Sequence, residues 1–297
     1  MLKRLSVLIA LMAWPALAET VEIETYRGSV HAPAAPTSIA VFDVSALDSL
    51  DALGIKPNAV IDPIFVDYLD AAKADAEIVG SLFEPDLEAL AALRPDLIIA
   101  GGRSSEAVPD LAKLAPTIDM TIWEDVVGQG LDRLASYGEI FGKEDEAAAL
   151  IAAFEAKLAA TKDAVTGHGT ALIVMTVGPK ISAYGAGGRF GWLHTAIGLP
   201  EAVENVEATT HGEAVSFEFI RDANPDILIV VDRLAAIGRP GKSARTTLDN
   251  ALVQETNAWK DGKVIYLDSA PLYIAGGGIQ SMNMTLDQIM NVLESAN

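Results

Sequence analysis

Short apolar runs alternate with helical stretches along most of the chain. In the first half, runs of Val, Ile, Leu and Ala predict four short buried strands, at residues 39–42, 59–61, 78–79 and 97–100. The segments 46–53 and 87–93 lie between these runs and carry apolar residues at helical spacing. Strands that alternate with helices are typical of βαβ units, so the pattern predicts a largely parallel sheet.

The same alternation restarts in the second half of the chain. It predicts four further strands and a final helix, at residues 171–176, 180–183, 226–231, 263–267 and 279–293 respectively. A near-terminal strand is also predicted over 20–25, followed by a connection rich in Pro and Ala. We therefore predict an α/β protein of two Rossmann-like lobes with mainly parallel sheets.

A long helix is predicted between the two halves. Residues 143–165 follow Gly142, are rich in Ala, Glu and Lys, and place Leu150, Phe154 and Leu158 at helical spacing. At ~1.5 Å per residue such a helix spans roughly 34 Å, about the size of one small domain. Its central position favours an interlobe connector over an ordinary helix within one lobe.

One motif occurs twice, 130 residues apart and without an internal gap. It consists of Glu, six residues, Pro-Asp, and seven residues ending in Arg: Glu88, Pro95, Asp96, Arg103 and Glu218, Pro225, Asp226, Arg233. In a βαβ unit the helix start and the following strand end lie at one sheet edge, where open parallel sheets bind ligands. We therefore expect a Glu and an Arg at one rim of each lobe. The alternative is that Pro-Asp merely marks a helix end, as in many α/β proteins.

The first residues are typical of a secretory signal. Lys3 and Arg4 precede a short apolar run, and Ala16 and Ala18 provide a small-residue cleavage site. The run is too short to span a membrane. We expect a signal peptide at 1–18, an N-terminal lobe at 19–142, a connecting helix at 143–166 and a C-terminal lobe at 167–297.

Composition narrows the function further. The chain has no Cys, which excludes disulfides, thiol catalysis and a lipidated cysteine after the signal, so a soluble periplasmic protein is expected. The formal charge is −20. Such an acidic surface repels nucleic acid and anionic membranes, so neither is expected as a partner. Arginine is scarce here, which makes a cluster of arginines informative.

Three further residues are candidates for a site. Arg189 follows a predicted strand in a Gly-rich loop, His211 lies in a polar loop, and Tyr273 precedes three glycines. Taken alone, each is as well explained by a surface salt bridge, a solvated loop or ordinary packing. Phosphate-loop, HExxH and GxSxG patterns are absent, which argues against an enzyme.

Several stretches together resemble a known family. They are KISAYGAGGRFGWLHTAIGL, ATTHGEAVSFEFI, NPDILIVVDR, TLDNALV and VIYLDSAPLYIAGGG. The mature chain resembles the class III periplasmic binding proteins of bacterial ABC importers, and within them the ferric-siderophore binders of the enterochelin or catecholate type. The Pro-Leu-Tyr before Ile274 departs from a more aromatic run in relatives, which leaves the exact siderophore open.

The resemblance implies roles for single residues. By their motif positions, Arg103, Arg189 and Arg233 would line the cleft and face an anionic ferric complex. His211 and Tyr273 would complete the iron shell when the siderophore supplies only four donors. Fe³⁺ is a hard ion that favours phenolate oxygen and accepts imidazole.

The resemblance also implies partners. Glu88 and Glu218 would each offer a carboxylate to arginines of the inner-membrane permease, which works with its ATPase. The binding protein would be a monomer, with no intrinsic cofactor and no enzymatic activity.

Several alternatives stay open at this point. The same fold could bind haem, a corrinoid or a hydroxamate siderophore, although three arginines favour an anion over a neutral hydroxamate complex. A periplasmic hydrolase of ferric complexes is a second class. A binder of free zinc or manganese is a third, which four scattered histidines do not favour.

Overall fold

The computed structural model describes residues 19–206, 209 and 211–295. The predicted signal peptide at 1–18 therefore lies outside the described residues. Within the described ranges, no helix has both the length and the apolar character that a membrane span requires.

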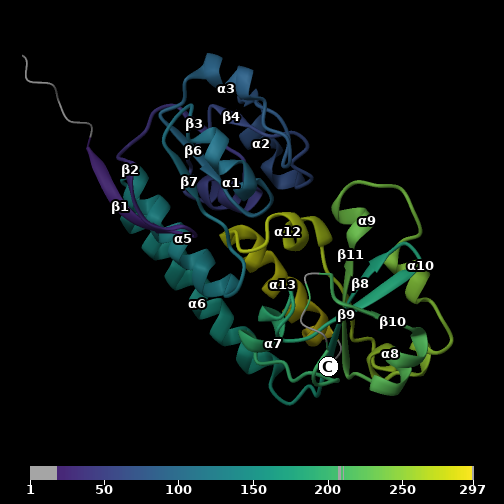
Figure 1. Cartoon of the computed structure of the whole chain (residues 1–297). Helices are drawn as coiled ribbons and strands as arrows, with labels where there is room; N and C mark the ends of the chain where they lie inside the picture. Colours follow the sequence, from purple (N-terminus) through teal and green to yellow (C-terminus); the bar gives the residue numbers. More distant parts are fainter. Residues whose placement is uncertain (1–18, 207–208, 210, 296–297) are drawn as a thin grey trace, which may run out of the picture.

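The N-terminal lobe is built on a five-stranded parallel sheet in the order β5-β4-β3-β6-β7 (Figure 1). Its strands are β3 (Ile39–Val41), β4 (Ala59–Val60), β5 (Glu77–Ile78), β6 (Leu97–Ala100) and β7 (Thr117–Asp119). Its helical segments are α1 (Val44–Ala52), η1 (Asp67–Leu69), α2 (Asp70–Lys73), α3 (Leu87–Leu93), η2 (Gly102–Ala107) and α4 (Val108–Leu111). The four strands predicted in this half are confirmed, to within a residue or so at their ends.

A β-hairpin precedes this sheet. Strand β1 (Thr20–Thr25) pairs antiparallel with β2 (Gly28–Pro33), so the predicted first strand is confirmed. The segment predicted as a connection forms β2 instead. Val30 and Ala32 of β2 pack against the core and His31 between them is exposed, an alternation too short to stand out in the sequence.

The C-terminal lobe is built on a mixed sheet in the order β10-β9-β8-β11-β12. Its strands are β8 (Ala171–Val177), β9 (Lys180–Tyr184), β10 (Glu213–Val215), β11 (Ile227–Asp232) and β12 (Val264–Tyr266). Its short helices are α7 (Trp192–Thr195), α8 (Phe217–Ala223), α9 (Arg233–Ala236), α10 (Ala244–Leu248), η3 (Val253–Glu255), α11 (Asn257–Lys260) and α12 (Ser269–Ile274). Strands β8, β11 and β12 are parallel, whereas β9 pairs antiparallel with both of its neighbours, β8 and β10. A two-residue turn at Gly178, whose φ is +59°, joins β8 directly to β9, which leaves no room for a crossover helix.

Three long helices connect and cover the lobes: α5 (Val126–Phe141), α6 (Glu144–Val165) and α13 (Ile279–Ser295). Helix α6 runs along the side of the molecule past both lobes, which confirms the helix predicted at 143–165 (Figure 1). Helix α13 packs against α6, α5 and α1 as well as α12. Because α13 contacts elements of both lobes, the division of the chain at residues 142 and 166 stays a prediction.

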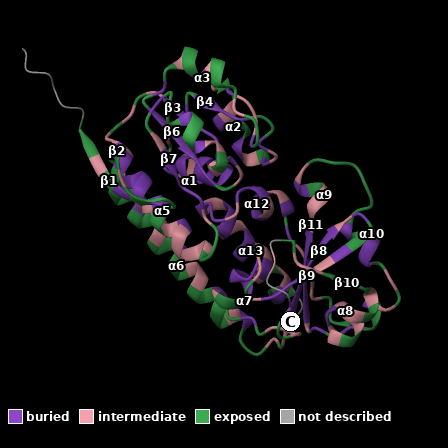
Figure 2. Cartoon of the chain, in the orientation of Figure 1, coloured by how far each residue is buried: buried purple, intermediate pink, exposed green. Residues whose placement is uncertain are grey.

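The two faces of the C-terminal sheet belong to different apolar clusters. Ile173 and Ile229 face a core that continues through α13, α5 and α6 into the N-terminal lobe. Leu172 and Leu228, one position along each strand, face a smaller cluster on the outer side. Figure 2 shows this buried interior running through the centre of the molecule, with α6 exposed along its outer side. The lobes therefore share one continuous core.

A buried carboxylate also joins the lobes. Asp48 of α1 is 0% exposed and accepts hydrogen bonds from the main-chain N–H groups of Gln280 (2.8 Å) and Ser281 (3.0 Å), in the first turn of α13. The Tyr68 hydroxyl donates to the same carboxylate. Burial raises the pKa of Asp48 to about 7, against the lowering effect of these hydrogen bonds. Asp48 thus satisfies N–H groups that a helix start leaves unpaired.

The aspartates of the repeated motif have a structural role. The Asp96 carboxylate accepts hydrogen bonds from the main-chain N–H groups of Thr37 and Ser38, just before β3. Asp226 does the same for the N–H of Thr170, just before β8. Each aspartate therefore ties the start of one strand to the start of its neighbour. The Pro-Asp pair in the repeat serves the fold rather than the site.

Because the Asp48 carboxylate joins the lobes, we predict that its substitution destabilises the protein more than substitution of the nearby Asp51 does. Asp48→Ala should lower the free energy of unfolding by about 2–4 kcal/mol, because it leaves two buried N–H groups and a hydroxyl without their acceptor. Asp51→Ala is the matched control, since among the described residues the Asp51 carboxylate accepts a hydrogen bond from the Gln280 side chain alone (3.0 Å). Urea denaturation measures both. Equal losses in the two variants would contradict this role of Asp48.

Candidate ligand-binding site

Three arginine side chains converge on Tyr273. Nη2 of Arg103 (3.1 Å) and Nη2 of Arg189 (2.5 Å) both donate to its main-chain carbonyl oxygen. Nε of Arg233 donates to its phenolic oxygen at 3.0 Å. The guanidinium carbon of Arg189 also lies 4.0 Å from the centre of the Tyr273 ring. The structure thus brings together four of the five residues for which a ligand role was predicted.

The position of Tyr273 explains why its carbonyl is available. Tyr273 is the penultimate residue of α12, which ends at Ile274. The last carbonyls of a helix have no partner within the helix and accept hydrogen bonds from elsewhere. Basic side chains at this end are also favoured by the helix dipole.

The arginines set the electrostatics of the site. Burial alone would raise the pKa of Tyr273, but the Arg233 hydrogen bond and the charges of Arg189, Arg233 and Arg103 outweigh it and lower that pKa. Burial, followed by the nearby Arg103 charge, lowers the pKa of Arg189. The guanidiniums therefore crowd one another, and an anion among them would be stabilised.

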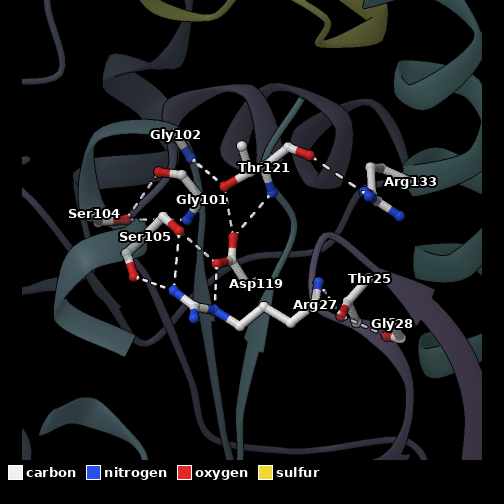
Figure 3. A network of polar contacts seen from close by, with 10 residues as sticks. All are labelled: Thr25, Arg27, Gly28, Gly101, Gly102, Ser104, Ser105, Asp119, Thr121 and Arg133. Atoms are coloured by element: carbon white, nitrogen blue, oxygen red, sulfur yellow. Dashed lines mark hydrogen bonds and ion pairs between the residues drawn. The ribbon is translucent and has the colours of Figure 1, made fainter. Parts of the chain in front are cut away.

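A polar network at the carboxyl end of the N-terminal sheet holds the residues on either side of Arg103, among them Gly102 and Ser104 (Figure 3). Gly102 N–H donates to the Thr121 hydroxyl (2.9 Å), and that hydroxyl donates to Asp119 (2.5 Å). Nε of Arg27, from the β1–β2 hairpin, pairs with the other oxygen of Asp119 at 2.8 Å. The hairpin therefore helps to fix the segment η2, which carries Arg103.

The other two arginines also stand on ordered supports. The loop before Arg189 is fixed where Glu201 accepts from the N–H of Ala186 at 2.7 Å. Arg233 is the first residue of α9, whose start is capped by the Asp232 carboxylate. The second oxygen of Asp232 accepts from the N–H of Ala244 (2.7 Å), which anchors the cap to α10.

These side chains border a cavity of about 590 Å³ between the lobes. Arg103, Arg189, Tyr273 and the exposed His211 line it. Arg233 contacts the cavity-lining Tyr273 through its hydrogen bond to the phenolic oxygen. The N-terminal wall adds Asp43, whose pKa is raised by burial although Ser45 donates to it and Arg103 lies near.

Sequence reasoning missed the aromatic residues of the N-terminal wall. Phe83 and Trp123 line the cavity and are 72% and 55% exposed. Each follows a parallel strand at its carboxyl end, Phe83 after β5 and Trp123 after β7. That position is where α/β sheets bind ligands, so the signal was present in the sequence.

The two repeated glutamates lie away from the cavity. Glu88 and Glu218 are exposed and occupy the first turns of α3 and α8. In Figure 1 these helices lie at opposite ends of the molecule. Hydrogen bonds from its own main-chain N–H and from Ser216 lower the pKa of Glu218. The structure therefore separates the glutamates of the repeat from its arginines.

The comparisons with known proteins agree with this arrangement. A family model described as "Periplasmic binding protein" matches residues 39–271. The chain belongs to this periplasmic binding protein family. The resemblance in the sequence and the two-lobed α/β fold are thereby confirmed.

Individual relatives in the family are similar over nearly their whole length. The petrobactin-binding protein YclQ of Bacillus subtilis is 37% identical over 93% of this chain and 88% of its own. The ferric-anguibactin-binding protein FatB of Vibrio anguillarum is 32% identical over 88% of this chain and 83% of its own. The crystal structure of the catecholate-siderophore binding protein VctP from Vibrio cholerae superimposes with a TM-score of 0.84, at 32% identity over 93% of this chain and 100% of its own.

Among residues 19–206, 209 and 211–295, no group of three or more His, Cys, Asp or Glu could hold a metal ion. Within the described residues, the cavity lining combines two arginines and five aromatic side chains with aliphatic residues and two carboxylates, Asp43 and Glu106. Such a lining suits an anionic complex better than a free cation.

The site predicts an unusual titration for Tyr273. Its phenol should ionise at lower pH than a free tyrosine, because three guanidiniums stabilise the phenolate. Arg233→Gln should move this ionisation to higher pH, since it removes both a hydrogen bond and a charge. Phenolate absorbance during a pH titration measures it.

Two variants control this titration. Tyr273→Phe should remove the early step, and Arg239→Gln, at an exposed position of the same lobe, should leave it in place. An early step that survives in Tyr273→Phe would show that another tyrosine is responsible.

Proposed function

We propose that this protein captures an anionic ferric siderophore of catecholate type in the cleft and delivers it to an inner-membrane ABC importer for iron uptake. The convergence of Arg103, Arg189 and Arg233 on Tyr273 is the observation that carries this function. The names of YclQ, FatB and VctP, which refer to siderophores, support it.

The charges of the cleft and of the ligand are complementary. A tris-catecholate ferric complex carries about three negative charges, which three guanidiniums balance. A guanidinium donates through a planar fork and also stacks on aromatic rings, so it suits catecholate better than an ammonium group does. In a chain of net charge −20, such a local positive cleft is needed to admit an anion.

Iron ligation by the protein is part of the proposal. His211 and Tyr273 line one cavity, and they would fill two positions on Fe³⁺ when the siderophore supplies four donors. The lowered pKa of Tyr273 favours the phenolate that binds a hard ion. The ion enters as cargo within the siderophore complex.

The cellular setting follows from the same proposal. The protein is exported through the signal peptide at 1–18, loses it, and works as a soluble, unlipidated monomer in the periplasm. It binds and releases its ligand without chemical turnover. Its protein partners are the ABC permease and the ATPase attached to it.

The proposed function predicts a ranking of ligands. Ferric tetradentate and hexadentate catecholates should bind more tightly than a neutral ferrioxamine-type hydroxamate, because only the former carry charge for the arginines. Arg189→Gln should weaken catecholate binding about 10- to 100-fold, the effect of losing a hydrogen bond to a charged group. Intrinsic fluorescence quenching measures each affinity.

Matched variants make this test specific. Arg221→Gln removes an exposed arginine that pairs with Asp222 outside the cavity, and it should bind as the wild type does. His211→Ala should weaken the tetradentate complex and leave the hexadentate one unchanged. Equal affinities of the wild type for catecholate and hydroxamate would overturn the proposal. Haem is titrated as well, and tighter binding of haem than of catecholate would also overturn it.

The proposed docking role of Glu88 and Glu218 predicts that removing both carboxylates impairs transport but not ligand binding. Glu88→Ala with Glu218→Ala should bind ligand normally, because both side chains lie outside the cavity, but should lose delivery to the importer. Uptake of ⁵⁵Fe-loaded siderophore by cells that carry the variant measures delivery. Glu146→Ala, an exposed carboxylate on α6, is the control. Normal uptake by the double variant would exclude these residues as the docking pair.

A further inference from the structure

Two aromatic side chains are held out into the cleft rather than packed. Phe83 (72%) and Trp123 (55%) are the most exposed large hydrophobic residues of the described chain. Both line the 590 Å³ cavity that Arg103, Arg189 and Tyr273 border. Exposure of large aromatic surface forfeits hydrophobic free energy, which a ligand covering the rings would restore.

Main-chain hydrogen bonds order the two loops that carry these residues. Phe83 lies in a tight turn in which the Ser81 N–H donates to the Glu84 carbonyl at 2.9 Å and the Phe83 N–H donates to the Ser81 hydroxyl at 3.3 Å. The N–H of Trp123 donates to the Gln129 side chain at 2.8 Å. Each ring therefore projects from an ordered loop.

Both walls of the cleft carry charged and aromatic side chains. The C-terminal lobe contributes Arg189 and Tyr273, together with Phe190 and Trp192. Phe83 and Trp123 come from the N-terminal lobe and offer apolar ring surface. Trp123 also borders a second cavity of about 460 Å³, next to Trp192 and Arg189, so its ring stands where the two spaces meet.

We propose that Phe83 and Trp123 form an aromatic wall that stacks on the aryl rings of the bound siderophore. This wall deepens the proposed function and rests on it. The arginines attract negative charge, which a ferric catecholate shares with a ferric hydroxycarboxylate such as ferric citrate. The aromatic wall stacks on aryl rings, so it favours anionic chelates that contain such rings over anionic chelates that do not.

Substitution by leucine separates ring stacking from plain apolar contact. Phe83→Leu and Trp123→Leu keep an apolar side chain but remove the ring. Each should weaken binding of a ferric tris-catecholate about two- to tenfold, the usual effect of one aromatic pair. Affinity for ferric citrate should stay unchanged. Isothermal titration calorimetry is the measurement, because it does not depend on Trp123 fluorescence.

The chain offers a matched control. Tyr26 is 51% exposed in the β1–β2 hairpin, outside the residues that line the cavity, so Tyr26→Leu should bind both complexes as the wild type does. Wild-type affinity for tris-catecholate in both cleft variants would overturn the aromatic wall alone. A loss of the same factor for ferric citrate would overturn it as well. A wild-type protein that binds no ferric complex would instead overturn the proposed function, and the wall with it.

Discussion

The buried Asp48 carboxylate is the contact on which the geometry of the cleft depends. It receives the first turn of α13, and Gly278 approaches it so closely that a Cβ atom there would lie 2.5 Å from the carboxylate. A Cβ at Gly277 would likewise lie 2.7 Å from Ile122, beside Trp123. Because α12 ends just before these glycines, the same contact fixes the distance of Tyr273 from the N-terminal wall.

A shared core makes this placement stiff. Apolar residues from α1, α5, α6, α13 and the inner face of the C-terminal sheet belong to one cluster. Large movements of one lobe would have to open that cluster and break the helix cap. Recognition in this cleft therefore relies on side chains that are already positioned, which reduces the ordering that binding requires.

Much of the fold could be predicted from local patterns, whereas the site could be predicted only in part. The buried strands and α6 follow from periodicity, and Arg103 and Arg233 follow from their place after repeated strands. The Tyr273 carbonyl as the meeting point of Arg103 and Arg189 depends on contacts 170 and 84 residues apart in sequence, which no local pattern contains. The contact of α13 with both lobes is equally non-local.

The carbonyl oxygen of Tyr273 competes with any bound anion for the guanidiniums of Arg103 and Arg189. Arg103 and Arg189 already have an acceptor within the chain, and this acceptor loses no translational freedom when it binds them. A small anion of single charge gains little by displacing it. A multiply charged chelate makes several charge-assisted hydrogen bonds at once and outcompetes it. Under the proposed function, one main-chain oxygen would therefore make the two guanidiniums selective for a multiply charged chelate over simple anions.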